Sequence, residues 1–423
     1  MSVSWTLDCV ACGTSHDGLD PRMTCDCGGT LDVAHDLDAL RGRVSRRVFD
    51  DRRGGRDRLD RSGVWRFREL ILPDVDPDLV ATKPEGNTNL YDVPSALADW
   101  AGLDALQLKH EGENPSGSFK DRGMTTGVTA ARLHGATKVA CASTGNTSAS
   151  MAAYAALCGL EAYVFVPAGK IAYGKLSQAL AFGAKTLQLD GDFDSALALV
   201  RAICRDHGVY LLNSVNPFRL EGQKAIGFEI LSDLGWRVPD WIVLPGGNLG
   251  NSSALGKGLL ELKALGLIDR LPRIAVIQAA GAAPLYRAWV DDAVPVPVQA
   301  DTVATAIRIG DPVSWRKSLR AVRESRGLVE SVTDAEILAA KARVDGAGIG
   351  AEPASCATVA GIKKLRAAGT IAQDAHVVGI LTGHLLKDPD VVVAYHRSDA
   401  ADANPPVQVE GTVPAVLEAL GLR

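Results

Sequence analysis

The sequence predicts an α/β protein with two three-layer α/β domains, mostly parallel sheets and a small cysteine-bearing N-terminal segment. Short apolar runs typical of buried strands alternate with helical patterns from about residue 106 to residue 381. This alternation favours parallel strands joined by helices that cover the sheet. The runs are too many for one compact sheet, so we expect two domains with a cleft between them. With 423 residues, the chain can bury both cores.

The expected strands are rich in β-branched and aliphatic residues. They are Leu106–Leu108, Val139–Ala142, Ala162–Val166, Thr186–Leu189, Val209–Leu212, Ile242–Leu244, Ile274–Gln278 and Val377–Leu381. The expected helices include Phe193–Asp206, Asp334–Val344 and a short tail helix at Val413–Leu420.

The N-terminal segment carries two cysteine pairs, each on a turn that contains glycine. The pairs are Cys9-x2-Cys12 and Cys25-x-Cys27, and they resemble the two knuckles of a small zinc ribbon, which supply four thiolates to a tetrahedral metal. The second pair is shorter than the usual Cys-x2-Cys knuckle, so reduced or vestigial thiols are the alternative. The other four cysteines lie among apolar or small residues and indicate core thiols, which fits a reducing cytosolic compartment.

A lysine stands at the mouth of a predicted helix, behind a loop of small and turn-forming residues. Ser118 can cap a helix that opens at Phe119 or Lys120. The helix dipole disfavours a cation at this position, so Lys120 is easier to deprotonate, and a neutral amine can attack a carbonyl. The alternative is a surface lysine followed by an Asp121–Arg122 ion pair.

Two further loops follow predicted strands and precede helices. Ser143–Ser148 leads into a small-residue helix expected at Ala149–Cys158, and Pro245–Ser252 leads into an apolar helix expected from about Ala254. The arrangement of strand, polar loop and helix binds anions at the helix N-terminus. Glycines in the second loop let the backbone close round a phosphate. Three such loops in one chain are a stronger signal than any one of them.

These loops resemble the fold-type II pyridoxal phosphate enzymes, and within that group the threonine synthase family. The resemblance rests on Ser118–Gly123, Ser143–Ser148 and Gly246–Asn251, and it extends over about residues 65–396. Further matching stretches are Ser62–Phe67, Glu85–Thr88, Asn213–Arg219, Ala306–Gly310, Glu352–Ser355 and Leu381–His384. The last stretch, continuing to Pro389, separates threonine synthases from the dehydratase and cysteine synthase branches.

The resemblance implies pyridoxal 5′-phosphate as cofactor. The residues themselves point to Lys120 as the catalytic lysine that carries the aldehyde and to the glycine loop as the phosphate cradle. The resemblance adds Asn146 at the cofactor's 3′ oxygen and Thr382 at the pyridine nitrogen. A strand-end cap is the alternative for Thr382. The expected cofactor contacts are Lys120, Asn146, Gly246, Gly247, Asn248, Leu249, Gly250, Asn251 and Thr382.

A phosphorylated substrate requires a second anion site. A polar, basic cluster follows the strand Val209–Leu212, and its strongest member is Arg219, because a guanidinium can bind phosphate in bidentate fashion. Lys224 is a further member, and a surface ion pair between Arg219 and Glu221 is the alternative. Together with the resemblance, this cluster gives the expected substrate contacts as Ser143, Thr144, Thr147, Asn213, Ser214 and Arg219.

The reaction implied by the resemblance converts O-phospho-L-homoserine and water to L-threonine and phosphate, by γ-elimination and β-addition of water. Two positions depart from the family pattern: Asn89 replaces a proline and Leu385 replaces a glycine. We expect Leu385 to add bulk near the cofactor ring, which leaves the substrate less determined than the cofactor. The alternatives are a paralogue, such as a cysteate synthase that joins O-phosphoserine and sulfite, and a catalytically silent member that binds a partner.

Residues 41–63 hold nine arginines and four aspartates with little apolar periodicity, which indicates a linker or a solvated helix. We expect five segments along the chain. They are a zinc-ribbon-like segment (1–35), an Arg-rich linker (36–63), a large cofactor-binding domain (64–112 and 216–402), a small domain (113–215) and a tail (403–423).

Composition and charge narrow the partners. A net charge of −5 argues against nucleic acid. No apolar run reaches membrane-spanning length, and no basic-then-apolar leader is visible, so we expect neither membrane insertion nor secretion. We therefore expect a cytoplasmic homo-oligomer, a dimer, that acts on a small phosphorylated amino acid.

Overall fold

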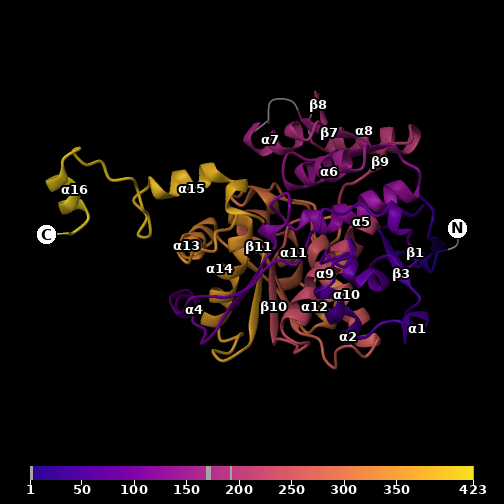
Figure 1. Cartoon of the computed structure of the whole chain (residues 1–423), viewed down its shortest axis with the longest axis horizontal. Coiled ribbons are helices and arrows are strands. Elements are labelled where there is room, and N and C mark those ends of the chain that lie inside the picture. Colours follow the sequence, from indigo (N-terminus) through magenta and orange to yellow (C-terminus); the bar gives the residue numbers. More distant parts are fainter. Residues whose placement is uncertain (1–2, 168–172, 191–192, 423) are drawn as a thin grey trace.

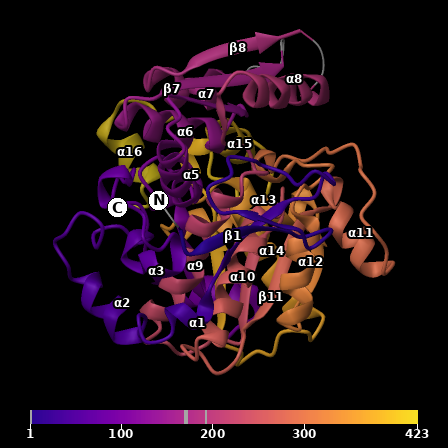
Figure 2. The ribbon, with the colours of Figure 1, turned by 90° about the vertical axis from the view of Figure 1, so that its right-hand side faces the viewer.

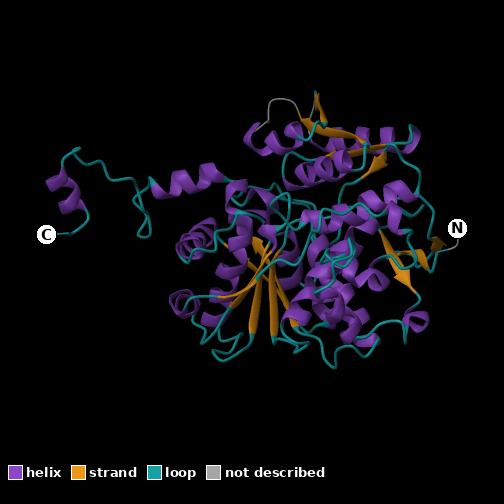
Figure 3. Cartoon of the chain, viewed as in Figure 1, coloured by secondary structure: helices purple, strands orange, loops and turns teal. Residues whose placement is uncertain are grey.

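The computed structural model describes residues 3–167, 173–190 and 193–422. Its largest sheet has six strands in the order β12-β11-β10-β13-β5-β4, at the centre of the larger body (Figure 3). Every neighbouring pair is parallel except β4 with β5. The strands are β4 (Leu90–Asp92), β5 (Gln107–His110), β10 (Trp241–Pro245), β11 (Arg273–Ala279), β12 (Leu328–Val332) and β13 (Val377–Leu381).

A second sheet has four parallel strands in the order β8-β7-β6-β9 and lies above the larger body in Figure 1. Its strands are β6 (Lys138–Ala142), β7 (Glu161–Pro167), β8 (Lys185–Leu189) and β9 (Tyr210–Leu211), and its helices are α6 (Asn146–Leu157), α7 (Tyr173–Ala181) and α8 (Phe193–Asp206). All eight expected strands are present in the two sheets, which confirms the α/β class. The sequence did not indicate β12, because Glu330 and Ser331 interrupt its apolar pattern.

Helix α9 is almost wholly buried and runs through the centre of the larger body, between α5 and α10. Its N-terminus is capped by Asn216, whose side chain accepts a hydrogen bond from the Arg219 amide at 3.3 Å. The helices of this body are α4 (Ser95–Ala101), α5 (Lys120–Leu133), α9 (Pro217–Asp233), α10 (Gly250–Ala264), α11 (Pro284–Val290), α12 (Trp315–Glu324), α13 (Asp334–Gly346) and α14 (Pro353–Ala367). Short 3₁₀ turns lie at Trp65–Phe67, Pro77–Leu79, Glu111–Glu113, Ala280–Ala282, Thr305–Ile307 and Leu385–Lys387.

The N-terminal segment forms a three-stranded antiparallel sheet in the order β2-β1-β3. It packs on the larger body beside α9 (Figure 2). An ion pair of 2.6 Å between Asp32 and Lys317 fastens it to that body. Its strands are β1 (Trp5–Cys9), β2 (Ser15–Asp17) and β3 (Leu31–His35), and the helices that follow are α1 (Leu37–Leu40), α2 (Arg46–Arg53) and α3 (Arg68–Ile71).

Several arginines of residues 41–63 bind the body of the protein. Arg52 donates to both carboxylate oxygens of Glu69, at 2.7 and 2.6 Å, and Arg53 lies 2.7 Å from Asp233. The arginines of this stretch therefore attach it to the body of the protein through ion pairs and hydrogen bonds.

The C-terminal helices α15 (Pro389–His396) and α16 (Val413–Ala419) extend away from both sheets (Figure 1). An ion pair of 2.8 Å between Arg343 and Asp402 ties the connecting stretch to α13. None of the helices in the described ranges is long and apolar enough to cross a membrane.

Candidate active site

A cavity of about 1510 Å³ opens where the two sheets face one another. Loops from both sheets line it, together with the first residue of α5. Among its lining residues are Lys120, Ser143, Thr144, Asn146, Thr147, Asn213, Ser214, Arg219, Gly247, Asn248, Leu249, Gly250, Asn251 and Thr382. The structure thus brings together every expected cofactor and substrate residue except Gly246, which lies behind the cavity wall against Val276.

Lys120 begins α5 and lines the cavity, and its amine lies 4.0 Å from the centre of the Phe119 ring. Burial, followed by the nearby guanidinium of Arg219, lowers the pKa of Lys120 to about 7. The amine is therefore largely neutral slightly above neutral pH, as a nucleophile requires. The main cause is burial, and not the helix dipole that the sequence suggested.

The alternative interpretation of the lysine motif is wrong. Asp121 does not pair with Arg122: it is buried and accepts hydrogen bonds from the amide and hydroxyl of Ser116, at 2.6 and 2.5 Å. Arg122 instead binds Glu111 and Glu229. The N-cap of α5 is Phe119 and not Ser118, whose hydroxyl only accepts from the Lys120 amide at 3.4 Å.

The glycine loop connects β10 to α10, which begins at Gly250, four residues earlier than expected. Leu249 adopts a left-handed conformation, with φ of 64°. A Cβ atom at Gly247 would lie 3.0 Å from the Ile307 backbone, so a larger residue would crowd the loop there. Both amide atoms of the buried Asn251 side chain lack a partner in the described chain. A tight loop, an open helix N-terminus and an unpartnered amide fit the phosphate of pyridoxal phosphate.

Asn146, at the first turn of α6, and Thr382, directly after β13, also line the cavity, the first from the side of the four-stranded sheet and the second from the side of the six-stranded sheet. The Thr382 hydroxyl lies 3.0 Å from Ser355 Oγ, and the backbone amides of Thr382 and Gly383 both donate to that serine. Ser355 therefore accepts the hydrogen bonds of the backbone amides that follow β13, so the Thr382 side chain is not needed to cap this strand. An amide and a hydroxyl that line the same cavity suit the ring oxygen and ring nitrogen of the cofactor.

The polar residues that the sequence predicts to bind a substrate phosphate, Asn213, Ser214 and Arg219, lie after β9 and in the first turn of α9. Arg219 is 3% exposed, donates to the Leu212 carbonyl at 3.0 Å and has no carboxylate partner among the described residues. Its Nε is also without a partner there, and burial lowers the pKa of Arg219 to about 10. Asn213 bonds through its amide to the backbone of Ala142, at 2.9 and 3.2 Å, and so ties this loop to β6.

Two expectations for this region are wrong. Lys224 does not contribute to the anion site: its amine is buried on the far side of α9, 2.6 Å from both Glu221 and Glu261. Leu385 does not narrow the cavity, because its side chain packs against Gly350, whereas its neighbours His384 and Leu386 face the cavity.

Three further lining residues have no role in the sequence-based prediction, and they are Arg308, Glu352 and Lys387. Lys387 bonds through its amine to the Gln178 side chain, and burial lowers its pKa. Burial also raises the pKa of Glu352, whose carboxylate faces Lys120. All three lie in stretches that match the threonine synthase pattern, which could have marked them as candidates. The sequence could not show that their side chains point into the cavity.

The four N-terminal cysteines form one cluster. Their sulfurs all lie within 4.8 Å of one another, and the closest pairs are Cys9–Cys27 and Cys12–Cys27, both at 3.5 Å. Four ligands at about 2.3 Å around zinc would be about 3.8 Å apart, so the cluster fits a tetrahedral metal with little adjustment. His16 Nε2 lies 3.4 Å from Cys25 Sγ, as an outer hydrogen-bonding partner would.

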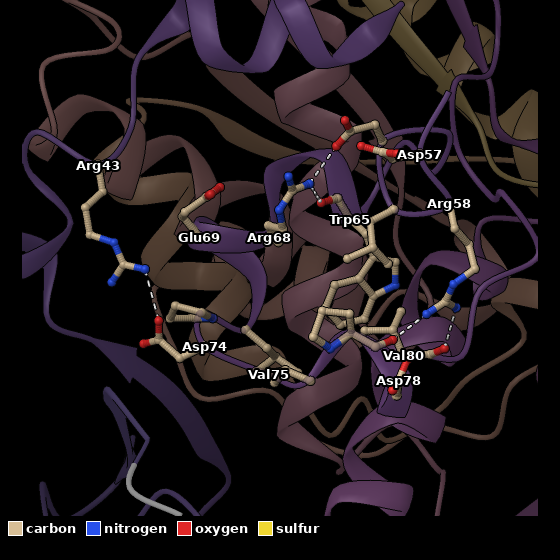
Figure 4. Close-up of a pocket in the computed structure, with 15 residues that line it drawn as sticks. Arg43, Asp57, Arg58, Trp65, Arg68, Glu69, Asp74, Val75, Asp78 and Val80 are labelled. Atoms are coloured by element: carbon tan, nitrogen blue, oxygen red, sulfur yellow. Dashed lines mark hydrogen bonds and ion pairs between the residues drawn. The ribbon is translucent and has the colours of Figure 1, made fainter. Parts of the chain in front are cut away.

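A second cavity, of about 550 Å³, lies beside the Arg-rich stretch and Trp65 (Figure 4). Its arginines are engaged with neighbours: Arg43 lies 3.0 Å from Asp74, and Arg68 lies 2.7 Å from Asp60. Arg58 donates to the Val80 carbonyl at 2.9 Å. Since these cations already have partners, this cavity lacks the free anion-binding groups of the larger one.

Comparison with known proteins agrees with this geometry. Residues 81–383 match the family model of pyridoxal-phosphate dependent enzymes. The chain is 47% identical over 420 residues to a threonine synthase of Methanosarcina acetivorans, covering 98% of each chain. It is 46% identical over 391 residues to a threonine synthase of Methanocaldococcus jannaschii, covering 91% of this chain and 93% of that one. Maize serine racemase has the same fold, with a TM-score of 0.61 at 21% identity over 71% of this chain and 88% of that chain.

The chain therefore belongs to the pyridoxal-phosphate-dependent enzymes, and within them to the threonine synthase family. This membership confirms the enzyme class and the cofactor that the sequence indicated.

Proposed function

We propose that this enzyme converts O-phospho-L-homoserine and water to L-threonine and phosphate. The observation that carries the proposal is the buried, carboxylate-free guanidinium of Arg219, on the cavity wall outside the glycine loop. A buried cation without a counterion is costly unless an anion arrives. Because the glycine loop already fits the cofactor phosphate, the second site suits the phosphate of a substrate.

The proposal includes the cofactor contacts, which are supported by residues that line the same cavity. Lys120 would hold the aldehyde carbon, and Gly247 to Asn251 would hold the phosphate, while Gly246 lies outside the lining. Asn146 would donate to the ring oxygen, and Thr382 would face the ring nitrogen. When bound, pyridoxal phosphate withdraws electrons from the substrate and stores the negative charge that forms at its carbons.

The residues of this chain bind the substrate and move its protons. The loop amides around Thr144 and Thr147 bind the α-carboxylate, with Ser143, Asn213 and Ser214 beside the phosphate and Arg219 against it. Lys120 moves protons at Cα and Cβ of the substrate, and its pKa of about 7 suits both directions of transfer. Phosphate leaves from Cγ, and water adds at Cβ.

The proposal includes the coarser features of the protein. The six-stranded sheet belongs to a large cofactor-binding domain of residues 64–112 and 216–402, and the four-stranded sheet to a small domain of residues 113–215. The cysteine cluster binds structural zinc. The enzyme works in the cytoplasm as a homodimer.

The test is a substrate comparison. Phosphate release is measured with O-phosphohomoserine, and separately with O-phosphoserine and sulfite, which a cysteate synthase would use. We expect kcat/KM to be at least about a hundredfold higher for O-phosphohomoserine. The reverse preference would establish the paralogue. No turnover of either substrate, and no visible absorbance with pyridoxal phosphate, would establish a silent member.

A further inference from the structure

Glu352 lies on the cavity wall, at the N-cap of the 15-residue helix α14, with 2% of its surface exposed. Its side chain makes no capping hydrogen bond to that helix. Among the described side chains, no Lys, Arg or His nitrogen is paired with its carboxylate. Burial raises the pKa of this carboxyl, whereas the Asn146 amide, the partial positive charge of the helix N-terminus and, at longer range, Lys120 and Lys387 favour its ionised form. A buried carboxylate without a direct ion pair calls for a specific use.

The carboxylate joins the two walls of the cavity. Asn146 Nδ2, on α6, donates to Glu352 Oε2 at 2.9 Å, and Thr382 Oγ1, at the end of β13, lies 3.3 Å from Glu352 Oε1. Asn146 lies on a helix beside the four-stranded sheet, whereas Thr382 follows a strand of the six-stranded sheet. These two residues are the ones proposed above to contact the cofactor ring. One side chain therefore fixes both ring contacts.

The contact with Asn146 determines which way its amide faces. The NH₂ group of the amide, and not its oxygen, points at Glu352 Oε2, and the ionised carboxylate would hold it there because that form only accepts hydrogen bonds. The second N–H of Asn146 then remains for a group in the cavity. Without the carboxylate, the amide could turn over and present its oxygen to the ring oxygen of the cofactor, which would be repulsive.

The backbone is shaped around this carboxylate. A Cβ atom at residue 383 would lie 2.4 to 2.7 Å from the carboxyl atoms of Glu352, so the close approach requires Gly383. The Glu352 amide also donates to the Gly383 carbonyl at 3.0 Å. The end of β13 and the start of α14 thus hold Glu352 in one position.

We propose that Glu352 is a positioning residue for the cofactor, acting through the amide of Asn146 and the hydroxyl of Thr382. The proposal rests on the cofactor contacts given under the proposed function, but not on the identity of the substrate.

The experiment compares Glu352→Gln with the wild-type enzyme and with Glu336→Gln, a matched change near the N-terminus of the neighbouring helix α13 and outside the cavity. Pyridoxal phosphate is titrated into the apo-protein, and the visible spectrum is recorded. Loss of a charged hydrogen-bond acceptor usually costs about ten- to a hundredfold, so we expect Glu352→Gln to weaken cofactor affinity and lower kcat by this factor, with a changed spectrum. KM for the substrate should change by less than about threefold. Glu336→Gln should change none of these.

A double-mutant cycle tests whether Glu352 acts through Asn146. In an Asn146→Ala background, Glu352→Gln should lose most of its effect on cofactor affinity. If the double variant instead loses the product of the two single-variant factors, Glu352 does not act through Asn146. Cofactor affinity and spectrum within about twofold of wild type in Glu352→Gln would overturn the whole proposal. If that variant does not fold, Glu352→Asp replaces it, and the shorter carboxylate must weaken cofactor affinity. Cofactor affinity and the spectrum need no phosphorylated substrate, so these two readouts remain decisive even if the substrate assignment fails.

Discussion

Arg219 and Glu221 lie two residues apart on α9 and serve opposite sides of that helix. Side chains at this spacing point about 200° apart, so they cannot form the ion pair that the sequence left open. Arg219 lines the cavity, whereas Glu221 lies 2.6 Å from His35 of β3 and 2.6 Å from Lys224. One helix therefore carries the anion site on one face and the attachment of the N-terminal segment on the other.

Replacing Arg219 by alanine should remove the substrate's phosphate contact and spare the cofactor. The loss of a charge-assisted contact to a dianion costs about 1.5–3 kcal/mol, so we expect kcat/KM to fall roughly ten- to a hundredfold or more. Arg219→Lys should recover only part of the loss, since an ammonium lacks the planar fork. The measurements are steady-state kinetics and the visible spectrum of the bound cofactor.

Arg205→Ala is the matched control, because Arg205 is exposed and pairs with Asp206 at 2.8 Å. It should leave both readouts unchanged. Loss of the cofactor in Arg219→Ala would place Arg219 in the cofactor site, and full activity would remove it from the substrate site.

Covalent attachment of pyridoxal phosphate should depend on pH through Lys120. Its pKa falls from the ordinary 10.5 to about 7, so the neutral amine dominates above that pH. We expect the attachment rate of the apo-protein to rise with pH up to about 7 and then level off. Between about 7 and 10.5 the unfolded state binds the additional proton, so the unfolding free energy of the apo-protein should rise with pH there.

The assay for attachment is borohydride reduction followed by mass analysis of the labelled peptide. Lys120→Ala should remain folded and take up no label. A label on Lys387, the other lysine among the described residues that line the cavity, or a midpoint near 10, would contradict the assignment.

The sequence indicated the two sheets, and the lysine and loops that line the cavity, because these depend on local patterns of apolar, glycine and polar residues. The sequence could not predict contacts between residues that are far apart in the chain. Periodicity did not show on which face of α9 the Lys224 side chain lies. It also could not reveal the hydrogen bond between Asn146 and Glu352. Leu385 was misjudged for the same reason, since one residue of rotation in a 3₁₀ turn moves a side chain out of the cavity.

The cysteine cluster should bind one equivalent of zinc. Its thiols already lie at nearly tetrahedral spacing, and none of them lines the cavity. We expect Cys12→Ser to lose the metal and Cys158→Ser, at a half-buried thiol outside the cluster, to keep it. Metal analysis of protein purified without a chelator decides the matter. Less than about half an equivalent would favour reduced thiols without a metal role.

Glu221→Ala should destabilise the fold strongly, although Glu221 lies outside the cavity. Burial raises the pKa of Glu221, but Lys224, Lys257 and His35 outweigh it and hold the pKa well below its usual range. Removal of this carboxylate leaves the buried Lys224 with fewer counterions, at a cost of about 3–5 kcal/mol in unfolding free energy. Denaturant titration measures the change. Asp206→Ala, at an exposed pair, is the control with no measurable change, and an equally small change in Glu221→Ala would show that the buried network adds no net stability.

The central claim is that phosphate leaves by elimination from Cγ and that water adds at Cβ. The most direct test is turnover of O-phosphohomoserine in ¹⁸O-labelled water, followed by mass analysis of both products. The account predicts L-threonine that carries one labelled hydroxyl oxygen, together with unlabelled phosphate, because the bond broken is the one between Cγ and oxygen. Homoserine with labelled phosphate would show hydrolysis at phosphorus instead, and would contradict the assigned reaction.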